Sequence, residues 1–173
     1  MDEVQGHAGI SFVNSQLFGR VVVKPTNSGP VRFTGCGLFG APAGNPEDAS
    51  HVDFSGTGHL SFENCHFIKL DPNNRGETVI RAQGGSLSVA NCLFMNDEKT
   101  HFELGPGVMS AVIIGNKFPR KEKIVNNTDG MVEIANNIND ELAILKGVAV
   151  KQQAVVSKQN SVKLTLDGKL TEP

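Results

Sequence analysis

The sequence predicts an all-β solenoid in which about six coils of chain stack on one another. Three observations support this prediction. An apolar pattern recurs six times along the 173 residues, with 21 to 29 residues between equivalent positions. An Asn or a Gly ends the pattern each time, and a second strand-like segment precedes the next repeat in most cases. A coil of this length cannot bury its own apolar face, so such repeats are stable only when stacked.

The apolar pattern is that of a short strand. Its equivalent positions are Phe12, Phe33, Phe62, Val89, Ile113 and Ile134. Two residues earlier stand Ile10, Val31, Leu60, Leu87, Ala111 and Val132. Side chains two residues apart lie on the same face of a strand, so both series are expected to face the core. No helical periodicity appears before about residue 139.

A residue that tolerates a left-handed backbone ends each of these strands. The six residues are Asn14, Gly35, Asn64, Asn91, Gly115 and Asn136. Asn and Gly adopt a positive φ more readily than other residues, and a single such residue turns a strand sharply. We therefore expect one corner per coil. After the corner the apolar series resumes at Leu17, Leu38, Phe67, Phe94 and Phe118, and Asn139 breaks it.

The second strand-like segment completes each coil. It reads RVVVKP, HVDFSG, ETVIRA, THFELG and EKIVNN in successive repeats. Equivalent strands of adjacent coils should lie about 4.8 Å apart. The coils take up residues 1–138. Residues 139–173 lack the corner motif, and we expect this tail to cover the final coil, because an open end leaves backbone groups unpaired.

Two kinds of solenoid match the strand and corner pattern. A leucine-rich repeat requires a further Leu three residues before the first apolar position. This chain has there His7, Ser28, Thr57, Gly84, Val108 and Asp129. A leucine-rich repeat also needs a Leu-rich convex segment, whereas this chain has Val, Phe and Gly. The pattern therefore favours a parallel stack of strands, with the leucine-rich repeat as the alternative.

The strand–corner–strand units resemble those of right-handed parallel β-helices, the pectin lyase-like superfamily. The units that carry the resemblance are LSFENCHF, LSVANCLF and AVIIGNKF, and it extends over residues 9 to 138. It implies a right-handed single-stranded parallel β-helix of about six coils with a C-terminal cap. It also implies a carbohydrate-active protein, a segment of a polysaccharide-processing glycoside hydrolase or lyase, whose partner is a polysaccharide or oligosaccharide.

Features usual among enzymes of that superfamily are missing from the sequence. No amphipathic cap precedes the first coil. Neither the paired Asp motifs of polygalacturonases nor the Arg-x-Pro-x-x-Arg run of pectate lyases occurs. We therefore expect missing N-terminal coils or a homo-oligomeric partner to complete the molecule. The alternative functions are a non-catalytic structural or adhesive rod, of the surface or phage-tail fibre type, and a carbohydrate-binding module.

Composition argues against several other classes of protein. The 16 basic and 18 acidic residues leave a net charge of -2, which favours neither nucleic acid nor an anionic membrane surface as a partner. No apolar run approaches the roughly 20 residues that span a bilayer. The first residues, MDEVQGHAGI, lack the basic start and apolar core of an export signal. An extracellular or cell-surface location agrees with the predicted function, although the sequence leaves location open.

The three cysteines share one column of the repeat. Cys36, Cys65 and Cys92 each follow the corner residue directly, so their sulfurs should stack between successive coils. The expected Cβ separation of about 4.8 Å exceeds the roughly 3.8 Å of a disulfide. No CxxC or His spacing indicates zinc. We therefore predict a buried ladder of thiols and no metal.

A candidate functional site lies where the coils differ most. The insertions between the corner and the second strand leave the same edge of the rod, beside the segments HVD, IRA and HFE. Asp53 and Glu103 should lie two coils apart, about 9.6 Å, near the roughly 6.5–9.5 Å carboxyl separation of inverting glycosidases. Arg81 would lie between them, able to lower both pKa values or to hold a uronate carboxylate.

We therefore name Asp53 and Glu103 as candidate catalytic residues. His51, Arg81 and His101 are candidate substrate-binding residues. The alternative is a solvated face whose charges pair across coils. No cofactor is predicted, although calcium is an alternative, since acidic and amide side chains could supply oxygen ligands to it. These side chains are Glu47, Asp48, Asp71, Asp97, Glu98, Asn73, Asn74 and Asn96, and no EF-hand spacing relates them.

Overall fold

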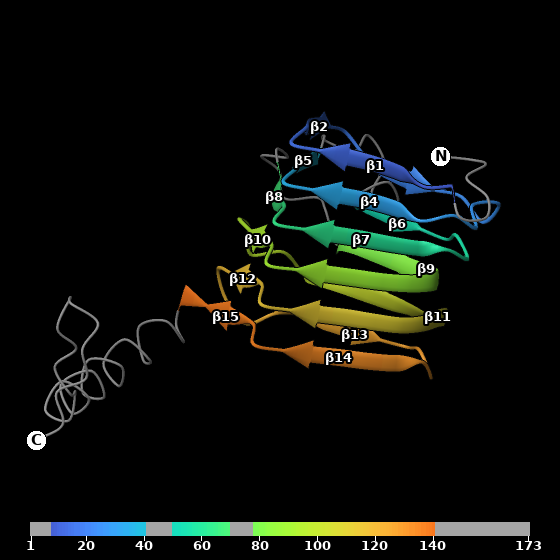
Figure 1. Cartoon of the computed structure of the whole chain (residues 1–173). Coiled ribbons are helices and arrows are strands. Elements are labelled where there is room, and N and C mark those ends of the chain that lie inside the picture. Colours follow the sequence, from blue (N-terminus) through green and yellow to red (C-terminus); the bar gives the residue numbers. More distant parts are fainter. Residues whose placement is uncertain (1–7, 41–49, 70–77, 141–173) are drawn as a thin grey trace, which may run out of the picture. The chain divides into compact units, whose positions relative to one another are not determined.

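The computed structural model describes residues 8–40, 50–69 and 78–140, which form a parallel β-solenoid of about five turns (Figure 1). The sequence predicted about six coils, whereas the structure has about five turns. All six predicted corner residues are present, and they mark the boundaries of these five turns. The described residues contain fifteen strands and no helix. The absence of helices from the described residues rules out the leucine-rich repeat with helical convex segments. None of the described residues belongs to a helix long and apolar enough to cross a membrane.

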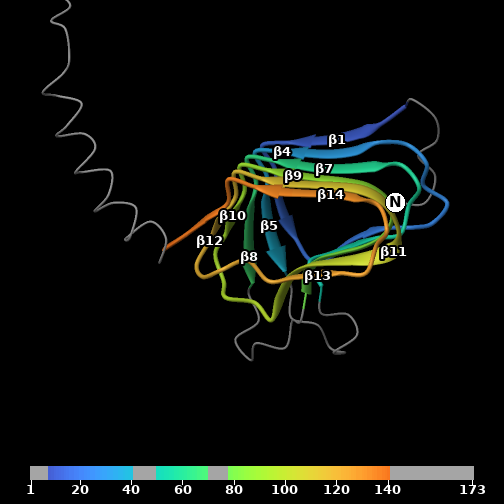
Figure 2. The same cartoon turned by 90° about the horizontal axis from the view of Figure 1, so that it is seen from below.

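Each turn contributes strands to three faces of the solenoid (Figure 2). The first face, before the corner, contains β1 (Ile10–Val13), β4 (Val31–Thr34), β7 (His59–Glu63), the second halves of β9 (Thr78–Ala90) and β11 (Thr100–Ile114), and β14 (Met131–Ala135). The second face, after the corner, contains β2 (Gln16–Phe18), β5 (Gly37–Gly40), β8 (His66–Lys69), β10 (Leu93–Phe94), β12 (Lys117–Phe118) and β15 (Ile138–Asn139). The third face contains β3 (Val21–Val23), β6 (Val52–Phe54), the first halves of β9 and β11, and β13 (Ile124–Asn126).

The corner between the first two faces is built as predicted. All six corner residues have a positive φ, between 49° and 67°. Gly35 shows why two of them are glycines. A Cβ on Gly35 would lie 2.4 Å from Oδ1 of Asn14 in the neighbouring rung, so a side chain there would meet both backbone strain and a steric clash. The left-handed residue therefore sets the corner of every rung.

A second bend carries β9 and β11 from the third face into the first. Gly85 has a φ of 62°. A Cβ on Gly85 would lie 2.3 Å from the carbonyl oxygen of Gly58, so only a glycine allows this close approach of neighbouring rungs. In β11 the register with β9 shifts between Leu104 and Gly107. Each long strand therefore bends without interrupting the stack.

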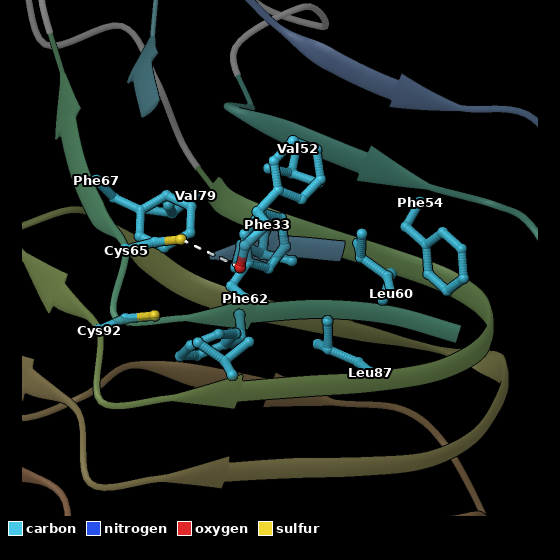
Figure 3. Packing of buried hydrophobic residues seen from close by; sticks show 14 of the residues in the cluster. Phe33, Val52, Phe54, Leu60, Phe62, Cys65, Phe67, Val79, Leu87 and Cys92 are labelled. Atoms are coloured by element: carbon cyan, nitrogen blue, oxygen red, sulfur yellow. Dashed lines mark hydrogen bonds between the residues drawn. The ribbon is translucent and has the colours of Figure 1, made fainter. Parts of the chain in front are cut away.

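Stacked phenylalanines fill the interior (Figure 3). On the first face, Phe33 stacks between Phe12 and Phe62, with ring centroids 4.8 Å apart on each side. A second stack on the second face consists of Phe67, Phe94 and Phe118, at 4.7 and 4.6 Å. These distances equal the spacing of adjacent strands, so each ring lies one rung from the next.

The cysteine ladder is also confirmed. All three cysteines are buried and free. Cys65 donates from Sγ to the carbonyl oxygen of Phe33 in the previous rung, at 3.4 Å (Figure 3). Cys36 makes the same contact with Phe12, also at 3.4 Å. The hydrogen bond with Cys65, together with burial, raises the pKa of the Cys92 thiol, which leaves this group unreactive in the folded chain.

Two asparagines continue the cysteine column toward the C-terminal end. Oδ1 of Asn116 accepts the N–H of Cys92 at 2.9 Å, and Oδ1 of Asn137 accepts the N–H of Asn116 at 2.9 Å. Each amide also donates to a carbonyl of the previous rung, Asn116 to Val89 and Asn137 to Ile113. Asn116 is fully buried, and these bonds satisfy its polar atoms, as a buried amide requires. The tail predicted to cap the rod lies, from residue 141 on, outside the described residues.

Candidate functional site

A row of charged side chains runs across the outer surface of the third face. Asp53 of β6 is in register with Arg81 of β9, and Arg81 is in register with Glu103 of β11. Their neighbours in sequence, such as Val52, Phe54 and Phe102, are buried in the core. The period-two alternation that buries those residues therefore turns the three charged side chains outward, in three successive rungs.

Asp53 lies at one end of the charged cluster. Its Oδ2 atom contacts the guanidinium of Arg20 and accepts a hydrogen bond from the hydroxyl of Ser50 at 2.8 Å. Its Oδ1 atom lies 3.5 Å from Nη1 of Arg81. The side chain of Asp53 is only 13% exposed. The carboxylate is therefore held between two guanidinium groups, with one further hydrogen bond.

Glu103 lies on the other side of Arg81. Oε2 of Glu103 accepts a hydrogen bond from Nε of Arg81 at 3.0 Å, and the hydroxyl of Thr78 lies 3.4 Å from the same oxygen. Arg81 and Glu103 are each 30% exposed. We call Arg20, Asp53, Arg81 and Glu103 the ionic row. It is a partly exposed, continuous chain of ion pairs along the direction in which the rungs stack.

The two candidate histidines are buried against phenylalanines of the second face. His101 is fully buried, and its ring packs edge-on against Phe118 and Phe94 at centroid distances of 4.8 and 5.6 Å. Its Nδ1 atom accepts the N–H of Lys123 at 3.0 Å. Burial is the main cause that lowers the pKa of His101, so the ring is neutral at pH 7. His51 is also buried, with its ring 6.4 Å from Phe67.

The structure therefore brings three of the five predicted site residues into one row, whereas the two histidines are buried against phenylalanines of the second face. Arg20, Ser50 and Thr78 were missed by the sequence analysis. Arg20 directly precedes β3, which pairs with β6, the strand of Asp53. The repeat could therefore have predicted that Arg20 lies one rung from Asp53. Ser50 and Thr78 carry no comparable signal, because their contacts depend on how the chain enters each strand.

The ionic row limits the acid–base chemistry available. A glycosidase of the inverting type needs one carboxyl group in its protonated form to act as general acid. Both carboxylates of the row are engaged by Arg81. Acid catalysis by Asp53 or Glu103 would therefore require the ion pair with Arg81 to open when substrate binds. Binding of polar or anionic groups requires only an exchange of partners at the guanidinium.

The described residues contain no group of three or more His, Cys, Asp or Glu side chains that could hold a metal ion. Asp97, one of the residues considered for calcium, contacts Lys123 at 2.8 Å and Arg120 at 3.2 Å. The hydrogen bond from Lys123 is the main cause that lowers the pKa of Asp97. Its carboxylate is thus neutralised by two cations. Of the other calcium candidates, Glu98 is buried and Asn96 is partly buried, whereas Glu47, Asp48, Asp71, Asn73 and Asn74 lie outside the described residues.

Comparison of the chain with protein-family models, with curated proteins and with solved structures found no match. The fold and the geometry of the row are therefore the observations from which function can be argued. A parallel β-solenoid supports many functions, so the argument must come from the row rather than from the fold.

Proposed function

We propose that this chain is a carbohydrate-active β-solenoid, a segment of a polysaccharide-processing glycoside hydrolase or lyase, and that the ionic row is its sugar-binding surface. One observation carries the proposal. Partly exposed arginine and carboxylate groups occupy equivalent positions in successive rungs, where an extended polymer lying along the rod could contact several of them in turn.

The chemistry of the row favours an acidic polysaccharide. A guanidinium presents a planar fork of donors that matches a carboxylate in a bidentate contact. A uronate carboxylate could therefore replace Asp53 at the longer, 3.5 Å contact of Arg81, while Glu103 keeps Nε in place. Sugar hydroxyls could donate to the oxygens of Asp53 and Glu103 that are not fully engaged. The proposal therefore names a uronan as the preferred substrate class.

Calorimetric titration with a panel of uronan and neutral glucan oligosaccharides tests the proposal. We expect binding to uronan and a loss of at least about tenfold in affinity for Arg81→Ala, which corresponds to about 1.4 kcal/mol. Glu103→Gln should also weaken binding. Glu133→Gln is its matched control and should leave binding unchanged, because Glu133 is an exposed carboxylate on the first face and not in the ionic row. Uronan that binds equally well to Arg81→Ala would contradict the assignment of the row.

Catalysis is tested by turnover of the same panel. If the row is catalytic, Asp53→Asn and Glu103→Gln each abolish turnover by the wild-type chain and leave the folded state intact by circular dichroism. Turnover that survives both substitutions would exclude catalysis by these residues. A chain that neither binds nor cleaves any oligosaccharide of the panel would end the carbohydrate proposal.

A second candidate function is a structural rod. The observation that favours it is that Phe18 and Met131, the two most exposed large apolar side chains among the described residues, lie in edge strands at opposite ends of the solenoid. Such side chains could contribute to surfaces that contact another chain. Light scattering tests this second candidate, since a strictly monomeric chain in solution would contradict a fibre.

A further inference from the structure

A second row of outward-facing positions runs beside the ionic row on the third face. Each position stands two residues after a member of the column that contains Asp53, Arg81 and Glu103, so it lies on the same side of its strand. The members are Ser55, Gln83, Gly105 and Asn127, and we call them the polar row. Two residues along a strand span about 7 Å. The third face therefore presents two parallel rows of polar groups about 7 Å apart.

The burial pattern confirms that the polar row faces outward. Ala82 and Leu104, which separate the two rows in β9 and β11, are fully buried in the core. Gln83 and Asn127 are exposed, and Ser55 is partly exposed. None of these three side chains carries a charge, although each can form hydrogen bonds. The ionic row is therefore accompanied by a neutral, hydrogen-bonding row.

The side chain of Gln83 lies across Gly105 of the next rung. A Cβ on Gly105 would be 2.8 Å from Cδ and 3.1 Å from Nε2 of Gln83, so the amide fills the space that a side chain at position 105 would take. Gly105 is itself buried although its position faces outward. The amide of Gln83 therefore reaches from the strand of Arg81 to the strand of Glu103, beside the ion pair that joins these two residues.

A β-bulge lies at this point of the third face. Because the register shifts between Leu104 and Gly107, β11 has two residues, Gly105 and Pro106, where β9 has only Gln83. Bulges are common beside binding and catalytic sites, where they change the direction of a side chain. A Cβ on Gly107 would collide with the carbonyl oxygen of Gln83, so the bulge encloses the backbone of Gln83 closely and leaves its side chain on the outer surface.

The amide of Gln83 is available to a ligand. Gln83 is exposed, and its amide has no hydrogen bond to another described side chain. The groups of the ionic row, by contrast, are already paired with one another. A primary amide carries an acceptor oxygen and two donor hydrogens side by side. It can therefore accept a hydrogen bond from one hydroxyl group and donate one to the hydroxyl next to it.

A single acidic sugar residue could contact both rows. Its carboxylate would pair with the guanidinium of Arg81, and the hydroxyl groups on the other side of its ring would lie toward Gln83. The spacing of the rows, about 7 Å, is comparable with the distance across a sugar ring and its substituents. A site that hydrogen-bonds a hydroxyl group discriminates against an analogue that lacks it. The polar row could therefore supply a selectivity that the ion pair with Arg81 alone does not.

We propose that Gln83 is a specificity-determining residue whose amide recognises two adjacent, unsubstituted hydroxyl groups of the sugar that binds Arg81. This inference rests on the proposed function of the ionic row and narrows its ligand to a uronan with a free pair of neighbouring hydroxyls. O-acetylation of these hydroxyls removes their donor hydrogens and adds bulk above Gly105. An O-acetylated uronan therefore keeps the contact with Arg81 and loses the contacts with Gln83.

Calorimetric titration of the full chain with a uronan oligosaccharide and with its O-acetylated form tests the proposal. We expect the wild-type chain to bind the free form about tenfold more tightly, as two hydrogen bonds would give. Gln83→Ala should lower the affinity for the free form about tenfold and leave that for the acetylated form unchanged. Gln16→Ala is the matched control and should have no effect, because Gln16 lies over Gly37 in the same way but on the second face.

A second variant moves the amide without removing it. Gly105→Ala places a methyl group where the amide of Gln83 lies, and only the end of a flexible side chain has to move, so the melting temperature should change little. The preference for the free form should nevertheless fall as it does in Gln83→Ala. Combining the two substitutions should cause no further loss, because both act on the same contact.

The outcomes separate this inference from the proposed function. If neither form of the uronan binds, both are overturned. If binding depends on Arg81 but the preference for the free form is absent or is unchanged in Gln83→Ala, the role of Gln83 is overturned and the ionic row remains the binding surface. A Gln83→Ala variant that loses thermal stability while it keeps the preference would show that the amide only covers the bulge, and it would overturn the inference as well.

Discussion

The inner rungs of the solenoid and its end rungs carry the same pattern but differ in burial. Phe33, with a phenylalanine stacked on each side, is fully buried. Phe12 occupies the same column one rung earlier, has one stacked neighbour and is only partly buried. Ile113 is fully buried, whereas Ile134 in the next rung is 43% exposed. Burial in a solenoid therefore depends on the rungs above and below, not on the residue type.

The largest expected effect follows from this contrast. Phe33→Ala removes a ring between two others and should lower the free energy of unfolding by about 3–5 kcal/mol. Phe12→Ala, at the partly buried end of the same column, should lower it by only about 1–2 kcal/mol. Urea denaturation of dilute protein measures both. Equal losses for the two variants would show that the first rung is covered in solution.

A corner substitution separates local strain from burial. Asn91→Ala forces an alanine to a φ of 54° and should lower the free energy of unfolding by about 1–2 kcal/mol. Asn91→Gly is the matched control and should have little effect, since glycine adopts this conformation freely. Because this strain belongs to the residue itself, Asn136→Ala in the last rung should lower the stability by a similar amount.

Thermal melting of the three corner variants measures this second contrast. If Asn136→Ala has no effect while Asn91→Ala is destabilising, the last corner relaxes from its left-handed conformation in solution. The difference between end and inner rungs would then extend from side-chain burial to the backbone.

The smallest expected effect is the pH dependence of an inner rung. His101 has a lowered pKa because it is buried, whereas an unfolded histidine titrates near pH 6.5. Between the two pKa values the unfolded chain binds more protons than the folded chain. Stability from the neutral ring is therefore complete above about pH 6.5 and decreases as the pH falls below that value. His101→Phe should make the melting temperature less dependent on pH.

The control for this measurement is His66→Gln, because His66 is partly exposed on the outer surface of the second face. That variant should keep the wild-type pH dependence. An identical dependence in wild type and His101→Phe would show that His101 is not the group that titrates.

Most of the fold could be predicted because its determinants are local. The preference of Asn14 or Asn64 for a positive φ and the alternation of Leu87 and Val89 are properties of a few adjacent residues. The repeat then multiplies these signals. The predicted cysteine ladder is confirmed for the same reason, since one column position per rung suffices to align Cys36, Cys65 and Cys92.

The candidate site was less predictable. The register of Asp53, Arg81 and Glu103 follows from the repeat, but their ion pairs depend on side-chain conformations that no periodicity specifies. The burial of His101 depends on Phe94 and Phe118, which reach it from adjacent rungs. The participation of Arg20 depends on a contact with Asp53, 33 positions later in the chain.

The sequence by itself determined where this chain forms strands, where it turns and which column faces the core, because these choices depend on backbone preferences and on a period of two. Only the tertiary structure decided which polar groups are accessible and how they pair, because both depend on contacts between residues that are 20 or more positions apart. The ionic row and the burial of His101 belong to this second kind of property.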